Sequence, residues 1–349
     1  MNRLTVFKKA LKLLSLVVGI GFIAYLVTLV RPGVPSRSAS LQFVGYIPLP
    51  RTQTVSVLDY ISVYGNQLYV AGMSSGSVSK VTLRNSALPT EADVSTIQGK
   101  PETHGVVIDP TSHLGFVTRS EENVVDVFDP ITMRMVTSIP VADDPDGIFF
   151  DPETKLIYVA SGDANMGTII DPEQRAVAGS IPLGGKPEYA SLDTSAHLLY
   201  QNLKSTDEVV SIDLKKHSVI DRWKLKGCNG PSGMAIDEHN RRLFIGCSTN
   251  AKLAIFTLED HRVLTTLPIG PDPDSIAFDV TLRRVYSAGK AGVTTVVQQD
   301  TLDRYHIADN IHTHYGAHTL TVDPKTHRVY IGYASLFVRP RVAVFDAIQ

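Results

Sequence analysis

Along most of the chain, hydrophobic and polar positions alternate in short runs that are separated by turn residues. Between residues 147 and 183, for example, the runs are "GIFFD", "LIYVAS", "GTIID" and "AVAGSIPL". Alternation with a period of two, β-branched residues and turns that start with Asp-Pro indicate strands rather than helices. The pattern therefore predicts four short strands in this segment.

This four-strand pattern recurs at a nearly constant interval. The copies are "THGVVIDPTSHLGFV", "PDGIFFDPETKLIYV", "PEYASLDTSAHLLYQ", "PSGMAIDEHNRRLFI", "PDSIAFDVTLRRVYS" and "AHTLTVDPKTHRVYI", with second residues His104, Asp146, Glu188, Ser232, Asp274 and His318. The second residues are 42 to 44 positions apart, and a degenerate copy, "LDYISVYGNQLYVAG", precedes them. Four strands per repeat of about 42 residues are typical of a β-propeller blade, so seven copies predict seven blades.

The two ends of the repeat region predict how the ring closes. The last copy finishes at "RVAVFDAIQ", which supplies a third strand and leaves no residues for a fourth. The segment Leu41 to Pro50 matches the fourth-strand pattern of the other copies. We therefore expect an all-β, seven-bladed propeller of four-stranded blades over residues 41–349. Its N-terminal strand completes the last blade and removes the open edge.

The N-terminal segment has the pattern of a membrane anchor. Basic residues precede an unbroken apolar run of 18 residues, Leu13 to Val30. As a helix this run rises ~27 Å, close to one hydrocarbon thickness. Basic residues flanking a membrane helix usually stay in the cytoplasm. Residues 1–30 are therefore expected to form a basic cytoplasmic flank and a single transmembrane helix, with everything beyond Arg31 outside the cytoplasm. Residues 31–40, rich in proline and serine, are expected to be a linker.

A cleavable signal peptide is the alternative interpretation of the same segment. Signal peptides usually have an apolar region of about 7–15 residues, which favours an uncleaved signal anchor here. However, the small residues Ser38, Ala39 and Ser40 would suit a peptidase. The propeller is thus expected to be membrane-anchored and extracytoplasmic, periplasmic in a Gram-negative cell, or secreted if the segment is cleaved.

Composition excludes several classes of protein. The formal net charge is -2, which gives no electrostatic footprint for nucleic acid. No CxxC, GxSxG, HExxH, Walker-type or GxGxxG motif is present. The two cysteines, Cys228 and Cys247, exclude a disulfide-dense scaffold and a four-cysteine zinc site. Both are expected at one end of the same blade, and an oxidising compartment favours a disulfide between them.

Several repeat copies carry the motif of a known family. The segments "LYVAG", "FVTRS", "IYVASGD" and "VYIGY", with the proline-bearing linkers "IPVADDPDG" and "LPIGPDPDS", resemble the YVTN-repeat (YncE-like) seven-bladed propellers. The resemblance covers about residues 41–349, although none of the copies reads YVTN literally. It implies the propeller fold and leaves the function open, because this architecture serves binding proteins, lactonases, lyases and redox enzymes.

Repeat phase separates structural carboxylates from functional ones. Ten aspartates start turns or end third strands, and aspartate caps such turns by binding backbone amides. These are Asp109, Asp129, Asp151, Asp171, Asp193, Asp213, Asp237, Asp279, Asp323 and Asp346. We assign them a structural role.

The residues that start the innermost strands are different, because they line the mouth of the central channel. Their types vary between imidazole and carboxylate, the groups used for metal ligation and proton transfer. A water-filled entrance would also be polar. The candidate ligand-binding residues are His104, Asp146, Glu188, Asp274 and His318.

The stretch "NIHTHYGAH" adds further imidazoles near this mouth. His312 and His314 are expected in the loop that enters the seventh blade, and His318 starts its inner strand. Together with His104 they are candidate ligands for a divalent transition metal. Their local spacing matches neither a helical pair nor a zinc finger, so the case depends on convergence of separate blades.

Basic residues and one long loop are also expected at the same end of the channel. Five basic residues are expected in loops between second and third strands: Arg119, Lys204, Lys290, Arg339 and Arg341. Such residues are either ordinary solvent-exposed charges or contacts for an anionic ligand. The longest of these loops carries Leu336, Phe337 and Arg339, the candidate contacts for a protein partner.

Two functional hypotheses follow from these features. The first is a membrane-tethered, extracytoplasmic binding propeller that recognises a small molecule or a protein at the channel mouth. The second is an enzyme at the same mouth, a metal-assisted lactonase, hydrolase or lyase. The absence of a recognisable catalytic motif favours the first hypothesis.

Overall fold

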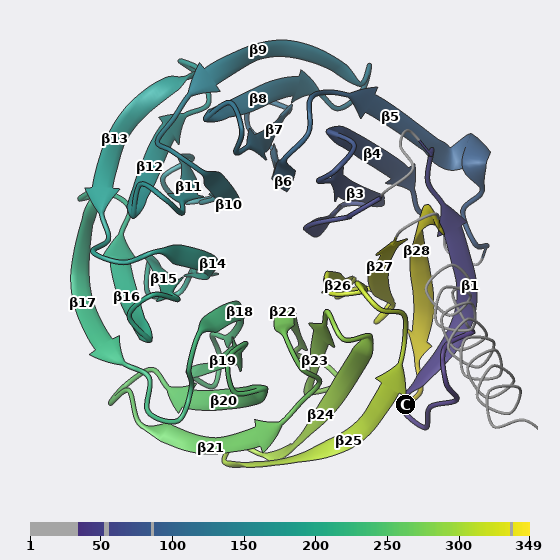
Figure 1. Cartoon of the computed structure of the whole chain (residues 1–349). Helices are drawn as coiled ribbons and strands as arrows, with labels where there is room; N and C mark the ends of the chain where they lie inside the picture. The colour runs from purple at the N-terminus through teal and green to yellow at the C-terminus, as the bar shows by residue number, and fades with distance from the viewer. Residues whose placement is uncertain (1–33, 52–55, 85–86, 336–337) are drawn as a thin grey trace, which may run out of the picture.

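The protein folds as a ring of seven antiparallel four-stranded sheets around a central channel (Figure 1). The computed structural model describes residues 34–51, 56–84, 87–335 and 338–349. In each of the first six sheets the strands lie in chain order from the channel outward. The predicted seven-bladed, all-β propeller is confirmed.

The strand bounds follow the repeat. The first blade contains β2 (Ile61–Tyr64), β3 (Gln67–Gly72), β4 (Ser77–Thr82) and β5 (Val94–Gln98), with a short 3-10 helix, η1 (Glu91–Asp93), before β5. The second contains β6 (Thr103–Asp109), β7 (Leu114–Arg119), β8 (Val124–Asp129) and β9 (Arg134–Pro140). The third contains β10 (Pro145–Phe150), β11 (Ile157–Ser161), β12 (Met166–Asp171) and β13 (Ala176–Pro182). The fourth contains β14 (Pro187–Asp193), β15 (Leu198–Leu203), β16 (Glu208–Asp213) and β17 (Ser218–Lys224).

The remaining blades continue the series. The fifth contains β18 (Pro231–Asp237), β19 (Arg242–Cys247), β20 (Lys252–Thr257) and β21 (Val263–Pro268). The sixth contains β22 (Pro273–Asp279), β23 (Arg284–Gly289), β24 (Val293–Thr301) and β25 (Arg304–His312). The seventh contains β26 (Leu320–Val322), β27 (Val329–Ser335), β28 (Val338–Ala347) and the N-terminal strand β1 (Leu41–Pro48).

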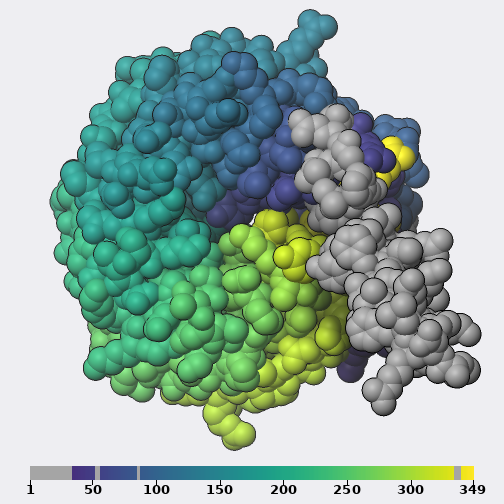
Figure 2. Space-filling model, in the orientation of Figure 1, coloured from purple at the N-terminus to yellow at the C-terminus, as the bar shows by residue number. Residues whose placement is uncertain are grey.

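Ring closure depends on β1, which pairs antiparallel with β28 from Leu41 opposite Ala347 to Pro48 opposite Arg341. The closing strand predicted from the sequence is therefore confirmed. A bulge interrupts this register between Phe43 and Gly45. In the space-filling view the colour runs once around a closed disc, so the earliest and latest described segments adjoin (Figure 2).

The hydrophobic core lies between neighbouring blades, as in other radial sheet assemblies. The aromatic residue of each copy is fully or almost fully buried in these layers: Tyr69, Phe116, Tyr158, Tyr200, Phe244, Tyr286 and Tyr330. The turn aspartates serve the backbone as predicted. Asp109, for example, accepts hydrogen bonds from the N–H groups of Thr111 (2.7 Å) and Ser112 (3.1 Å).

The predicted membrane helix, Leu13 to Val30, lies outside the described residues. Within the described ranges, no helix is long and apolar enough to cross a membrane.

We expect the closing strand to carry much of the stability. Ile47 on β1 is fully buried in the layer between the first and seventh blades, whereas Val44 on the same strand is 39% exposed. Replacing Ile47 with alanine should lower the free energy of unfolding by about 3 kcal/mol, because it leaves a cavity in that layer. Val44→Ala should change it by less than ~0.5 kcal/mol. Urea unfolding of both variants measures the difference, and equal midpoints would contradict the closure argument.

Candidate functional site

The candidate site is the channel mouth at which the inner strands of the blades begin. All inner strands start at the same end of the channel, so the first residues of different blades meet there. The structure brings together the predicted residues His104, Asp146, Glu188, Asp274 and His318, and Ser232 with them, through the contacts described below. We call this end the top mouth.

One half of the top mouth is organised by His104, at the start of β6. Its Nδ1 lies 2.6 Å from Asp59 Oδ2 in the neighbouring blade, and its Nε2 lies 2.9 Å from Ser120 Oγ. Nδ1 is also 3.7 Å from Asp146 Oδ1. The side chain of His104 is largely buried, with 12% of its surface exposed.

The surroundings of His104 favour its charged form. Burial by itself lowers the pKa of the imidazole, but the hydrogen bond to Asp59 and the charges of Asp59, Asp146 and Glu102 outweigh it. The result is a pKa raised to about 9. At neutral pH His104 is therefore an imidazolium that donates to Asp59 and Ser120.

The other half of the mouth is a chain of ion pairs and hydrogen bonds. Lys204 Nζ is 3.0 Å from Glu188 Oε1, and Ser232 Oγ lies 3.3 Å from Glu188 Oε2 and 3.0 Å from Asp274 Oδ1. Two further groups approach Asp274 Oδ2: Lys290 Nζ at 3.5 Å and His318 Nε2 at 3.6 Å. The Nδ1–H of His318 donates to the carbonyl of Gly316 (2.7 Å) and fixes the ring.

The carboxylates of the mouth are desolvated and repel one another. Desolvation and the charge of Asp59 raise the pKa of Asp146 well above its usual value, although His104 opposes the shift. Desolvation also raises the pKa of Glu188, against the opposing effect of Lys204. Asp146 Oδ1 is buried and accepts no hydrogen bond within the described residues. Negative charge is therefore incompletely compensated at Asp146.

The channel directly below the mouth is lined by aromatic rings. The ring of Tyr189 lies 5.0 Å from that of Tyr60 and 5.1 Å from that of Phe149. All three line a cavity of about 220 Å³, together with residues of β2, β6 and β10. Burial and the nearby acids, Asp146 and Asp59 first among them, raise the pKa of Tyr60, so its hydroxyl stays protonated.

The four histidines considered as metal ligands do not come together. His312 ends the outermost strand of the sixth blade, where it pairs with Val293 and its N–H donates to Ser36 Oγ (2.9 Å). The expectation that it lies in a loop at the mouth is wrong, because β25 extends through this residue. His314 is buried inside the seventh blade, with its ring stacked on Tyr333 (6.1 Å between centroids). Burial and the charge of Arg341 lower its pKa.

Among the residues that the structure describes, one group of three offers ligand atoms close enough for a metal. Asp59, His104 and Asp146 each place one such atom within 4.8 Å of the others. His104 is thus the single member of the predicted histidine set that belongs to a candidate metal group. A metal at Nδ1 would have to displace the proton that His104 shares with Asp59.

Sequence reasoning missed Asp59 and Ser120. Asp59 is the second residue of the degenerate copy "LDYISVYGNQLYVAG" and so has the same repeat position as His104. This repeat position could have identified Asp59 from the sequence. The alignment was obscured because the turn of that copy is two residues shorter than in the others. Ser120 follows Arg119 in a loop between second and third strands, the class of loop expected at the top.

The candidate partner loop is only partly described. Leu336 and Phe337 lie outside the described residues. Arg339 is exposed and bridges the seventh and first blades, with Nη1 2.8 Å from Glu91 Oε1 and Nε donating to the carbonyl of Leu49 (3.2 Å). Of the other basic residues, Lys204 and Lys290 lie at the mouth, whereas Arg119 pairs with Asp126 (2.8 Å) and Arg341 covers the ring of Tyr46 (4.3 Å).

Cys228 and Cys247 form a buried disulfide, with Cα atoms 5.1 Å apart. Cys247 ends β19 and lies opposite Pro231, the first residue of the fifth inner strand. The bridge therefore fixes the segment that leads into Ser232 at the mouth.

Comparison with known proteins shows the fold and no more. No protein-family model matches the chain, and no curated protein matches it. Among solved structures, a chain of Kuenenia stuttgartiensis hydrazine synthase superposes with a TM-score of 0.73 at 17% identity, covering 85% of this chain and 97% of that one. Virginiamycin B lyase from Staphylococcus aureus superposes with a TM-score of 0.68 at 12% identity, covering 88% and 99%. At these identities the chain shares the propeller fold with both proteins.

The raised pKa of His104 predicts a pH-dependent contribution to stability. Because the pKa rises from 6.5 to about 9 on folding, the stabilisation is complete below pH 6.5 and is lost as the pH rises through about 9. The loss should be roughly 3 kcal/mol. Urea unfolding at pH 6 and pH 10 should show this fall for the wild type and a smaller fall for His104→Gln. If the unfolding free energies of the wild type and His104→Gln fell by the same amount between pH 6 and pH 10, His104 would not be ion-paired in the folded state.

Proposed function

We propose that the top mouth is a binding site for a small organic cation. The observation that carries the proposal is Asp146, whose buried Oδ1 has no hydrogen-bond donor among the described residues and whose pKa is raised. The rest of the Asp146 side chain is 26% exposed, so an ammonium group would reach the carboxylate there, and its charge would favour the ionised form. Glu188 would favour the same cation, because its pKa is also raised.

The channel below the mouth suits the rest of such a ligand. The cluster of Tyr60, Phe149 and Tyr189 offers apolar surface and the faces of aromatic rings, which attract cations by about 0.5–2 kcal/mol. A cavity of about 220 Å³ lies below the range of about 300–1,000 Å³ found for drug-sized ligands. The site is therefore matched to a small amine with an apolar body.

We also propose that the propeller is tethered to a membrane and faces an extracytoplasmic compartment. The tether would be the apolar run Leu13 to Val30, which lies outside the described residues. The Cys228–Cys247 disulfide supports the compartment, because such bonds persist in oxidising environments. Membership of the YVTN-repeat family is a proposal that depends on the sequence motifs and the shared fold.

Calorimetry with two matched probes tests the binding function. Phenethylammonium should bind the full-length protein, and phenylacetate, which carries the opposite charge on a similar body, should not. Asp146→Asn should weaken phenethylammonium binding at least tenfold, because a hydrogen bond to a charged group contributes about 1.5–3 kcal/mol. Asp300→Asn, at an exposed position on the outer part of the sixth blade, is the control and should bind normally. Equal binding of both probes would exclude recognition by charge.

A hydrolase is the second candidate function, and the arrangement of three side chains favours it. Ser120 Oγ, His104 and Asp59 are linked in the order and at the distances of a serine-histidine-aspartate triad, 2.9 Å and 2.6 Å. Ser120 Oγ would bond to the acyl carbon of an ester while His104 Nε2 takes its proton. The bond to the leaving alkoxide then breaks, and the alkoxide takes that proton. Water releases the acyl group from serine by the same steps.

The hydrolase hypothesis predicts a specific pH profile. His104 accepts a proton only when neutral, so the rate of p-nitrophenyl acetate hydrolysis above background should rise up to about pH 9. Ser120→Ala should abolish this rate and block labelling by a fluorophosphonate, whereas Ser205→Ala, in another exposed loop, should not. Activity that survives Ser120→Ala but needs added Zn²⁺ or Mn²⁺ would instead support metal-assisted hydrolysis at Asp59, His104 and Asp146. No activity under either condition would leave the mouth as a binding site.

A further inference from the structure

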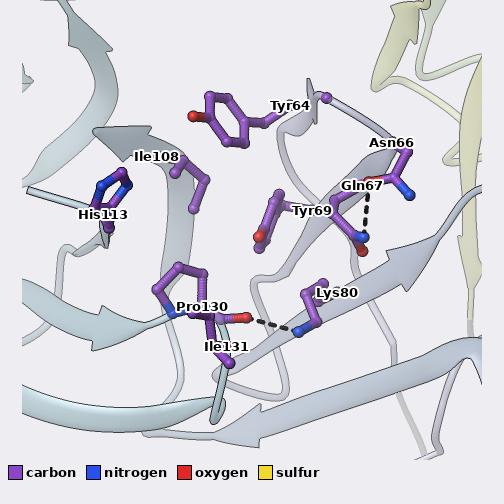
Figure 3. Close-up of a pocket in the computed structure, with 10 residues that line it drawn as sticks. Tyr64, Asn66, Gln67, Tyr69, Lys80, Ile108, His113, Pro130 and Ile131 are labelled. Carbon is purple, nitrogen blue, oxygen red and sulfur yellow. Dashed lines mark hydrogen bonds between the residues drawn. The ribbon is translucent and has the colours of Figure 1, made fainter. Parts of the chain in front are cut away.

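A second cavity lies at the opposite end of the propeller, between the first and second blades. Its volume is about 370 Å³, within the range of about 300–1,000 Å³ typical of small-molecule sites. The first blade contributes Tyr64, Tyr69 and Lys80 (Figure 3). The second blade contributes Ile108, His113, Pro130 and Ile131. None of these residues belongs to the top mouth.

The cavity exists because the first repeat is shorter than the others. In the second blade four residues connect β6 to β7, whereas only Gly65 and Asn66 connect β2 to β3. Gly65 has a φ of +61°, which favours glycine and lets the chain turn this tightly. The first blade therefore does not fill the space beside the turn of the second blade, and a hollow forms.

The first blade also lacks the aspartate of a bridge that two other blade interfaces have. His327 of the seventh blade lies 2.7 Å from Asp279 of the sixth, and Arg241 of the fifth pairs with Asp193 of the fourth. His113 has the repeat position of His327 and Arg241, but the aspartate position of the first blade is Tyr64. The His113 side chain has no hydrogen bond or ion pair within the described residues and is exposed beside the cavity.

The walls of the cavity are suited to an aromatic ring. Tyr64 is 41% exposed and Tyr69 lies buried at the inner end, so one ring is accessible and the other forms part of the base. Ile108, Pro130 and the highly exposed Ile131 supply aliphatic surface from the second blade. Large exposed hydrophobic side chains that border a cavity are favourable for apolar ligands.

The ionisable groups of the cavity favour a negative charge on the ligand. Lys80 Nζ donates to the carbonyl of Pro130 (2.6 Å), and an ammonium has two further N–H groups. Asp129, whose carboxylate interacts with the charge of Lys80, accepts hydrogen bonds at Oδ1 from the backbone N–H groups of Ile131 (2.7 Å) and Thr132 (3.1 Å). Among the described residues that line the cavity, Lys80 and His113 are the two basic ones, and none is a carboxylate.

We propose that this cavity between the first two blades binds a small planar aromatic molecule that carries an anionic group. The ring would pack on Tyr64 and Tyr69, and the anion would accept hydrogen bonds from Lys80, assisted by His113. This site is independent of the cation site at the top mouth, because it differs in location, in the sign of its charge and in the blades that form it.

The test compares probes that share one ring system. Ligand-observed NMR with the full-length protein should detect binding of 1-naphthoate and much weaker binding of 1-naphthylmethylammonium. Tyr64→Ala and Lys80→Met should each weaken 1-naphthoate binding at least tenfold. Tyr315→Ala, which removes an exposed tyrosine at 64% exposure in the loop before the seventh inner strand, is the matched control and should have no effect.

If Lys80→Met fails to fold, 1-naphthoate binding by Tyr64→Ala is the decisive measurement. Tyr64 is 41% exposed, so its replacement removes little packing. Unchanged 1-naphthoate binding by Tyr64→Ala would overturn the proposal. Equal affinity for the two naphthyl probes would also overturn it, because the cavity would then recognise apolar surface without charge.

Discussion

Pairing of β1 with β28 is the constraint on which the rest of the structure depends. A propeller blade buries its sheet faces against its two neighbours, so a missing fourth strand would expose the layer shared by the seventh and first blades. The chain closes the ring with residues from its own N-terminal end. Closure fixes where each inner strand begins, and the contacts of the top mouth follow from that geometry.

Much of this fold is readable in the sequence because it arises from repetition. Alternating runs, turn aspartates and buried aromatics recur at the same phase, so one copy predicts the others. The repeat also predicted which residues meet at the mouth, since inner-strand starts converge whatever their side chains are. His104, Asp146, Glu188, Asp274 and His318 illustrate this: no local motif connects them, but each lies within 4 Å of a charged or polar mouth partner.

The errors occur where a segment departs from the repeat. His312 belongs to a strand because β24 and β25 are each nine residues long, longer than the six- or seven-residue strands at the same positions of the three preceding blades. His314 turns inward onto Tyr333, a contact that no periodicity encodes. Asp59 was overlooked because the turn of the first copy lacks two residues and its aspartate is replaced by Tyr64. Hydrogen-bond partners such as Ser120 depend on side-chain geometry, which the repeat phase does not determine.

The degenerate first repeat is therefore the most informative part of the molecule. At the top it supplies Asp59, whose carboxylate keeps His104 charged and adds to the repulsion felt by Asp146. At the opposite end Tyr64 stands where two other blades carry a bridging aspartate, and the short turn leaves an accessible cavity beside it. At the repeat aspartate position the fourth and sixth blades bridge to their neighbours through Asp193 and Asp279, whereas the first blade, which contributes to both candidate sites, carries Tyr64 there. The departures of the first copy from the repeat thus place Asp59 at the top mouth and Tyr64 beside the second cavity, so one irregular repeat contributes to both candidate sites.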